Sequence, residues 1–200
     1  MAKRGRKAGA SGEESRAKLL VIAAEEFAEK GFYETKISSI VKKANVTQPT
    51  FYLYFESKEA IFKELVESFR GKLFDLAAGS RIETGLAPEK VPERIIQGLS
   101  AIFTLFKENI NETRIGFLQS SESEEIKTQL ASMIELNLIA EREDGYFNVA
   151  LDMGTVAESL VGIMERLTIT QLFKGLKEPS QIATEIVNLF LFGMLPPSTE

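Results

Sequence analysis

The sequence predicts an all-α protein built from two parts. Apolar residues recur with the helical period in nearly every segment, and no run alternates polar and apolar residues as a strand would. This periodicity fails between Gly79 and Pro92, where glycine and proline cluster. A chain of 200 residues that is 44% hydrophobic and 26% charged can bury one core and a small second one. We therefore expect an N-terminal domain over residues 1–56, a connecting helix over 57–78 and a C-terminal helical domain over 79–200.

The N-terminal domain is predicted to hold three helices, followed by the longer connecting helix. Gly31 ends the first helix, and Asn45, which tolerates the left-handed conformation of a tight turn, ends the short second one. The connecting helix carries an apolar stripe from Ile61 to Leu76. Four residues are placed to cap successive helices, the first within a capping box: Ser11, Thr35, Thr47 and Ser57.

The C-terminal domain is predicted to hold five further helices and a turn at Gly145. Asp152 and Ser180 are placed to cap the last two helices. The expected helices lie near 93–109, 113–120, 122–141, 152–173 and 180–195.

Composition excludes most catalytic chemistry. The chain has no Cys and no His, so it lacks a thiolate nucleophile, an imidazole base and the usual zinc ligands. Two acidic clusters lie at a predicted helix start and in a predicted turn, where acids are expected as caps and as solvated faces. They are Glu122, Glu124 and Glu125, and Glu141, Glu143 and Asp144. No phosphate-binding loop, nucleophile elbow or metal-ligand spacing accompanies them. We expect no enzyme activity, no cofactor and no metal site.

Charge is distributed unevenly along the chain. Residues 1–60 hold 11 Lys and Arg against 8 Asp and Glu, a net charge of +3, whereas residues 61–200 hold 13 against 21, a net charge of −8. Attraction to phosphates is local and is screened beyond about 10 Å at ordinary salt. The basic front end is therefore the part expected to meet a polyanion.

The second and third helices, joined by a tight turn, have the layout of a helix-turn-helix. On a helix starting at Thr47, Phe51 and Phe55 point inward, and the outer face is rich in hydroxyl and amide groups. Such groups bond base edges and phosphates without carrying a full charge. Pro49 lies in the first turn, where its missing N–H costs nothing. This face predicts contact with DNA.

Three segments of this region closely resemble the DNA-binding region of the TetR family of bacterial transcriptional regulators. They are Phe27–Phe32, Thr35–Val41 and Thr47–Phe62, and the resemblance covers about residues 15–70. The resemblance implies a recognition helix from Thr47 to Tyr54 and a dimer that reads a palindromic operator. The position of Tyr54 is often His in the family, and Pro49 stands where a small residue is common. The implied DNA contacts are base contacts from Gln48, Pro49 and Thr50 and backbone contacts from Tyr52, Tyr54, Lys58 and Lys36, beside the capping residue Thr47.

A basic arm precedes the first helix. Arg side chains on such an arm can enter a narrow minor groove, and a flexible solubilising tail is the equally weighted alternative. The arm residues are Lys3, Arg4, Arg6 and Lys7.

The last two helices are apolar nearly all round, so a second subunit is expected to cover them. The candidate interface residues are Leu160, Leu167, Ile186 and Phe190. Large apolar residues of the middle helices and their polar neighbours suit a cavity for a hydrophobic ligand. The candidate pocket residues are Phe103, Phe106, Arg114, Phe117, Leu118, Gln119, Met133, Met164, Glu165 and Arg166.

These expectations combine into a cytoplasmic, ligand-responsive transcriptional regulator. It is expected to be a repressor that binds double-stranded operator DNA as a homodimer and is released by a small hydrophobic effector. A ligand beside the far end of the connecting helix would shift that helix and spoil the spacing of the two recognition helices. No apolar stretch is long enough to span a bilayer, so no membrane partner is expected. The alternative is a helical interaction or small-molecule-binding scaffold that does not bind DNA.

Overall fold

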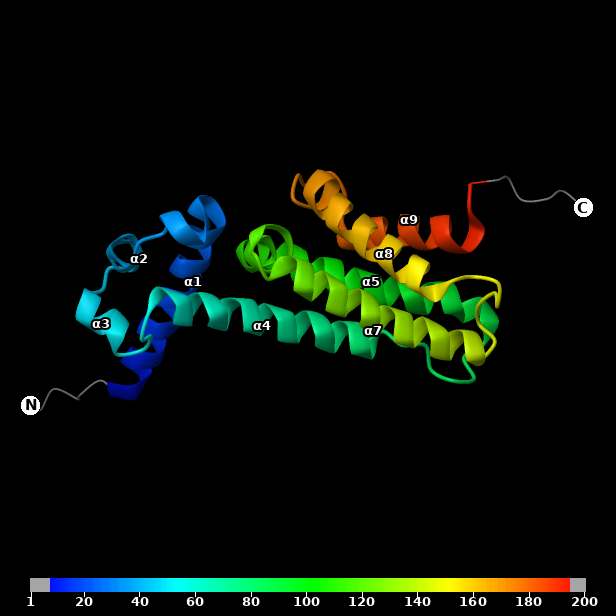
Figure 1. The fold of residues 1–200 in the computed structure, drawn as a ribbon, viewed down its shortest axis with the longest axis horizontal. Helices are drawn as coiled ribbons and strands as arrows, with labels where there is room; N and C mark the ends of the chain where they lie inside the picture. Colours follow the sequence, from blue (N-terminus) through cyan, green and yellow to red (C-terminus); the bar gives the residue numbers. More distant parts are fainter. Residues whose placement is uncertain (1–7, 195–200) are drawn as a thin grey trace, which may run out of the picture. The chain divides into compact units, whose positions relative to one another are not determined.

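A computed structural model describes residues 8–194, with side chains described from Gly12 onward. These residues form helices and no β-strand, which confirms the all-α prediction (Figure 1). The α-helices are α1 (Ala8–Glu34), α2 (Ile37–Ala44), α3 (Gln48–Tyr52), α4 (Lys58–Gly79), α5 (Val91–Glu108), α6 (Ile110–Thr113), α7 (Ser123–Glu143), α8 (Met153–Leu167) and α9 (Pro179–Phe192). A 3-10 turn, η1 (Pro88–Lys90), precedes α5, and two π-helical segments, η2 (Arg114–Gln119) and η3 (Thr168–Leu172), follow α6 and α8.

The chain divides into two compact units. The first unit consists of the described residues up to Phe69 together with Asn111–Ser123, and the second consists of Arg70–Ile110 together with the described residues from Glu124 onward. This division differs from the predicted boundaries at residues 56 and 78. The boundary falls within α4, and a short segment of the C-terminal half belongs to the N-terminal unit, because Ile115 of η2 is buried in its core.

The core of the first unit is largely aromatic. Phe27 of α1 lies with its ring centroid 5.0 Å from that of Phe62 of α4, edge to face. Phe51 of α3 is fully buried, and Phe55, just before α4, is 3% exposed. The predicted core role of Phe51 and Phe55 is therefore confirmed. Figure 1 shows α2 and α3 beside α1 and the first turns of α4.

Three of the predicted helix caps are confirmed. The Thr47 hydroxyl accepts the N–H of Thr50 (3.3 Å) at the start of α3. The Ser57 hydroxyl accepts the N–H of Ala60 (3.2 Å) at the start of α4. Asp152 accepts the N–H of Thr155 (2.7 Å) at the start of α8.

The other three caps are wrong. Helix α1 already runs from Ala8, so Ser11 lies inside it. Lys36 rather than Thr35 is the N-cap of α2, because the Thr35 hydroxyl donates back to the Gly31 carbonyl (2.8 Å). The N-cap of α9 is Glu178, two residues before the predicted cap Ser180, and it forms a capping box with Gln181.

Several predicted helix ends also move. The continuous helix of α1 stops at Gly31, as predicted, because its φ of 78 and ψ of 166 are non-helical, and a further helical turn runs on to Glu34. The helix expected over 113–120 is a short α6 followed by η2, and the helix expected to reach Phe173 ends at Leu167 and continues as η3. Both changes place π-helical turns where regular helix was predicted, and such turns are frequent at functional sites.

The second unit is built from α5, α7, α8 and α9, with α9 packed along α5 (Figure 1). A carboxylate holds the connection after α4 in place. Glu141, near the end of α7, accepts the N–H of Ile82 (2.7 Å), and burial raises the pKa of this carboxyl. Within the described range, no helix combines the length and the apolar character that crossing a bilayer requires.

A buried carboxylate joins α1 to α2. Glu26 of α1 is fully buried and contacts the ammonium groups of Lys30 (2.5 Å) and Lys43 (2.5 Å) and the hydroxyl of Ser39 (2.6 Å). Burial raises the pKa of Glu26, but hydrogen bonds from Lys30, Lys43 and Ser39 lower it more strongly, from 4.5 to about 2. The ionised form therefore stabilises the fold.

We expect Glu26→Gln to lower the free energy of unfolding by roughly 1–3 kcal/mol at pH 7, because an amide replaces a carboxylate paired with two cations. The stabilisation by ionised Glu26 is complete above pH 4.5 and is lost as the pH falls through about 2. The difference between the two proteins in urea unfolding should shrink over that window. Glu13→Gln, at an exposed position of α1, is the matched control. A difference that stays constant from pH 7 to pH 3 would contradict this role.

Gly116 of η2 lies against an aromatic ring of α4. A Cβ at Gly116 would lie 2.6 Å from Cδ1 of Phe69, well inside normal contact. We expect Gly116→Ala to lower the free energy of unfolding by about 1–3 kcal/mol through overpacking. Gly71→Ala serves as the control, because no described atom lies within 4 Å of a Cβ there, and this change should stabilise by about 0.4–1 kcal/mol. Equal urea midpoints for the two variants would refute the close packing.

Candidate nucleic-acid interface

The segment from α2 to α3 forms a helix-turn-helix. Asn45 follows α2 with φ 55 and ψ 44, so the left-handed turn predicted there is confirmed. The N–H of Val46 donates to the carbonyl of Val41 (3.0 Å) and closes the turn. Helix α3 then begins with Pro49 in its first turn and ends at Tyr52, two residues before the predicted end of the recognition helix.

One face of α3 is buried and the opposite face is open to solvent. Phe51 fixes the helix to the core, and its ring centroid lies 5.7 Å from that of Phe55. Gln48 and Pro49 are exposed, and Tyr52 is 50% exposed. These three residues can reach a groove of a duplex without disturbing the core. The exposed face is uncharged, so recognition of a base sequence by α3 would rely on hydrogen bonds and apolar contacts.

The two threonines of α3 are partly engaged with each other. The hydroxyl oxygens of Thr47 and Thr50 lie 2.8 Å apart, and Thr47 also caps the helix. Each oxygen keeps lone pairs for a further partner. Tyr54 is half-buried, and its hydroxyl points back to α1, where a Cβ at Gly12 would lie 3.3 Å from it.

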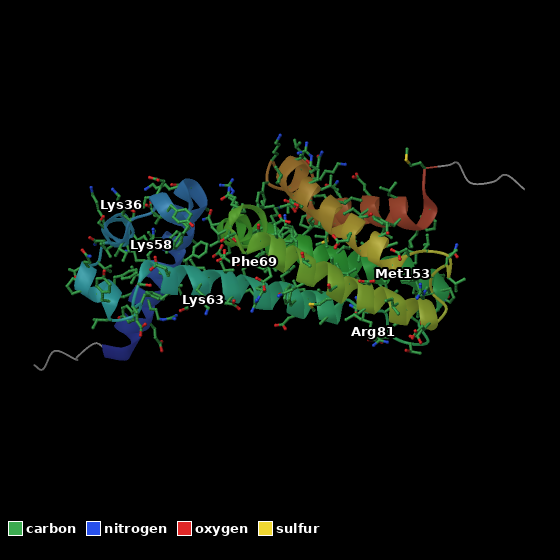
Figure 2. The ribbon with its side chains drawn as sticks, in the orientation of Figure 1. Lys36, Lys58, Lys63, Phe69, Arg81 and Met153 are labelled. Carbon is green, nitrogen blue, oxygen red and sulfur yellow. The ribbon has the colours of Figure 1, made fainter. Side chains whose placement is uncertain are left out.

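Lys58 has a structural role that the sequence analysis did not foresee. Its ammonium donates to the carbonyls of Phe32 (2.8 Å), Tyr33 (3.4 Å) and Thr35 (3.1 Å), and it lies 4.4 Å from the centroid of the Phe32 ring. An ammonium has three donors, and all three face carbonyls here. Lys58 thus holds the end of α1, and a phosphate would have to compete with these acceptors (Figure 2).

Lys36 remains in solvent at the start of α2 (Figure 2). It is therefore available as a phosphate contact in a way that Lys58 is not. Lys42, which the sequence analysis did not single out, is also exposed in the last turn of α2. The predicted arm of Lys3, Arg4, Arg6 and Lys7 lies outside the described residues.

An apolar cavity of about 90 Å³ lies within the second unit. None of the predicted pocket residues lines it. Glu165 is instead paired with Lys127 (3.1 Å), Arg166 is exposed, and Phe103, Phe106 and Met164 are fully buried core residues. The lining residues are Ile95, Leu99, Leu138, Phe147, Leu151, Met153, Val156, Leu160, Ile186, Val187, Phe190 and Leu191.

A larger cavity, of about 630 Å³, lies within the first unit. Of the predicted pocket residues, Gln119 lines it, while Arg114, Phe117, Leu118 and Met133 line neither of the two cavities. No residue of 70–79 lines either cavity, whereas the sequence analysis placed the ligand beside that stretch of α4. Aromatic residues near Gly31, namely Phe27, Phe32 and Tyr33, line the larger cavity, and the sequence analysis assigned none of them to a ligand site.

The predicted dimer residues are divided between core and surface. Ile186 is 2% exposed and belongs to the core of the second unit, while Leu160 and Leu167 are half-buried. Phe190 is exposed, as are Leu189 and Phe192, which the sequence analysis did not single out. Helix α9 therefore buries one apolar face within the unit and exposes a second one.

Comparisons with known proteins agree with this architecture. Residues 19–65 match the family model of bacterial regulatory proteins, tetR family. The HTH-type transcriptional regulator YdgC of Bacillus subtilis is 46% identical over 189 residues, which cover 94% of this chain and 97% of that protein. The HTH-type transcriptional regulator EthR of Mycolicibacterium smegmatis is 27% identical over 207 residues, covering 97% and 94%.

Solved structures show the same fold. The fatty acid degradation regulator FadR from Bacillus halodurans superposes with a TM-score of 0.68 at 21% identity, covering 96% of this chain and 98% of that one. The relatives are transcriptional regulators and not enzymes. With a helix-turn-helix in its first unit and a relative that is similar along nearly its whole length, the chain belongs to the TetR family of DNA-binding transcriptional regulators.

Proposed function

We propose that this regulator is a repressor that binds a palindromic operator as a homodimer and leaves it when a small hydrophobic effector binds. The observation that carries the proposal is the exposed, uncharged face of α3, held on the fully buried Phe51. Contacts within the first unit, from Lys58 and Glu26, hold α1 and α2 in place. Presentation of α3 therefore needs no effector, which fits a protein that occupies its operator until an effector arrives. We place it in the cytoplasm, where bacterial operator DNA lies.

In this proposal Gln48, Pro49 and Thr50 read base edges. The Gln48 amide is exposed and can bond an adenine bidentately, and Pro49 offers an apolar contact to a thymine methyl. Tyr52, Tyr54, Thr47 and Lys36 contact the sugar-phosphate backbone, and the basic arm adds a minor-groove contact. Lys58 supports the site by holding the end of α1 and is a phosphate contact only if it releases a carbonyl.

We propose that dimerisation uses the exposed apolar face of α9. Leu189 and Phe192 are 45% and 65% exposed, and Phe190 lies between them in the sequence. Leu160 and Leu167 of α8, at half-buried positions, are the other residues that we propose for this contact, whereas Ile186 is buried within the unit. Exposed apolar patches of this kind mark association sites, and a twofold contact pairs each patch with its own copy.

The effector site proposed here is the cavity of the second unit. Its lining is wholly apolar, which suits a hydrophobic group. Its volume of about 90 Å³ is below the roughly 300–1,000 Å³ of most ligand sites, so it would accept a small apolar group, or a larger one only by widening. Helix α4 has residues in both units and is the element through which widening would change the spacing of the recognition helices.

The operator contacts are tested with duplexes selected from a random pool by the purified protein. We expect Gln48→Ala and Tyr52→Ala each to weaken binding to the selected duplex by about 5- to 100-fold, because each removes a contact in the groove or at its edge. Lys36→Ala should weaken binding to all duplexes to a similar degree. It should also reduce the slope of the logarithm of the binding constant against the logarithm of the salt concentration by about one. Lys174→Ala, at an exposed position of the second unit, is the matched control. Wild-type affinity of the two α3 variants would show that α3 does not recognise the operator.

The dimer surface is tested by sedimentation. We expect Leu189→Glu and Phe192→Glu to shift the protein from dimer to monomer, because each places a charge in an apolar contact. Leu136→Glu, at a 67% exposed apolar position of α7, should leave the dimer intact. Dimers in the α9 variants, or a wild-type monomer at micromolar concentration, would show that this face does not mediate association.

A further inference from the structure

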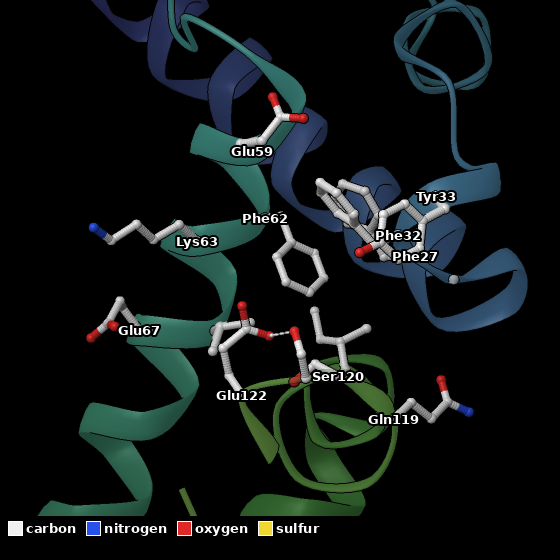
Figure 3. A pocket seen from close by; sticks show the side chains of 14 residues that line it. Phe27, Phe32, Tyr33, Glu59, Phe62, Lys63, Glu67, Gln119, Ser120 and Glu122 are labelled. Carbon is white, nitrogen blue, oxygen red and sulfur yellow. Dashed lines mark hydrogen bonds between the residues drawn. The ribbon is translucent and has the colours of Figure 1, made fainter. Parts of the chain in front are cut away.

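The cavity of the first unit has a lining that none of the functions above uses. It lies between the end of α1, the first turns of α4 and the segment from η2 to α7 (Figure 3). Its volume is about 630 Å³. That volume is within the range of sites that hold small organic molecules. All of its lining residues belong to the first unit.

One wall of the cavity is aromatic. Phe27, Phe32 and Phe62 form a cluster, with ring centroids 5.0 Å apart for Phe27 and Phe62 and 4.9 Å apart for Phe32 and Phe62. Tyr33 adds a fourth ring, 5.4 Å from Phe32, and is 89% exposed. Aromatic faces carry negative potential and attract cations as well as apolar surface.

The charged residues of the lining are mainly acidic. Glu59, Glu67 and Glu122 line the cavity against a single cation, Lys63. Figure 3 shows Glu59 and Glu122 on either side of the Phe62 ring, while Lys63 and Glu67 project from the other side of α4. The three carboxylates of the lining outnumber its one cation, so their field favours a positive occupant over a negative one. One further cation, Lys58, lies outside the lining, next to Glu59 in the sequence and over the Phe32 ring.

The segment that follows η2 adds polar residues to the lining. Ser120 lines the cavity, and its hydroxyl oxygen is buried without a hydrogen-bond partner among the described residues. Ser120 follows directly on η2, whose Ile115 and Gln119 also line the cavity.

We propose that this cavity is a binding site for a lipophilic cation, that is, an aromatic or alkyl-rich molecule with one delocalised or quaternary positive charge. Phe32, Tyr33 and Phe62 pack against its apolar surface, and Tyr33 and Phe62 provide cation–π attraction, since the Lys58 ammonium already lies over the Phe32 ring. Glu59 and Glu122 neutralise its charge at the exposed rim, where the cation keeps part of its hydration. The site is separate from the apolar cavity of the second unit, where the effector of the proposed function binds.

The site is tested by calorimetric titration of the full-length protein with tetraphenylphosphonium and with tetraphenylborate. These ions have nearly the same shape and opposite charge, so the difference between them isolates the electrostatic part of recognition. We expect the phosphonium to bind at least about tenfold more tightly than the borate. The titration contains no DNA, so its result is independent of operator recognition.

Variants locate the site. Glu59→Gln combined with Glu122→Gln should weaken phosphonium binding by about tenfold, because it removes both flanking charges. Glu13→Gln combined with Glu56→Gln changes net charge equally at exposed positions of the same unit that do not line the cavity, and it should bind as the wild type does. Phe62→Leu, which keeps apolar volume, should also weaken binding, with thermal unfolding used to confirm that each variant is folded.

Four results would overturn the proposal. They are no phosphonium binding up to millimolar concentration, equal binding of the two ions, equal binding by the two double variants, and loss of binding in Leu160→Ala with retention in the Glu59 and Glu122 double variant. The last result would place the cation in the cavity of the second unit.

Discussion

The three hydrogen bonds of the Lys58 ammonium are the interaction on which the geometry of the first unit most depends. The last carbonyls of a helix have no partner within it, and Gly31, with non-helical dihedrals, interrupts α1 just before its end. Lys58, the first residue of α4, supplies the missing donors, because its ammonium donates to the carbonyls of both Phe32 and Thr35. Because Thr35 leads directly into α2, one side chain fixes where α1 ends, where α2 begins and where α4 starts.

The short helices of the interface rely on such tertiary anchors. Helix α3 has five residues, far fewer than an isolated helix needs for stability in water. Phe51 fixes it from below and Thr47 caps its start, while α2 is tied to α1 through the carboxylate of Glu26. The exposed face of α3 can therefore vary in sequence without loss of the fold, because the anchors lie on other positions. If α3 reads the operator as proposed, substitutions on this face would change the operator and leave the fold intact.

Local signals in the sequence were enough to predict the elements of the interface. Asn45, Thr47 and Phe51 follow from turn preference, capping and helical spacing, each of which depends on a few adjacent residues. The roles of Lys58 and Glu26 could not be predicted in this way, because their partners are 23 to 26 and up to 17 positions away in the sequence. The two cavities were not predicted for a related reason: helical periodicity shows which residues turn inward but not where packing leaves space. The aromatic residues around Gly31 fill part of a core and also line a cavity, and the sequence alone does not distinguish these two roles.

The membership of Asn111–Ser123 in the first unit has a consequence for how this protein can be divided. The unit that carries the helix-turn-helix is not one continuous stretch of chain, because Ile115 completes its core from a point far along the sequence. A fragment cut after α4 would open that core to water and leave the ring of Phe69 without its neighbour at Gly116. A chimera that takes only its N-terminal half from another such protein would therefore pack residues of two different proteins against each other inside one hydrophobic core. Exchange of the exposed α3 residues alone would leave that core unchanged.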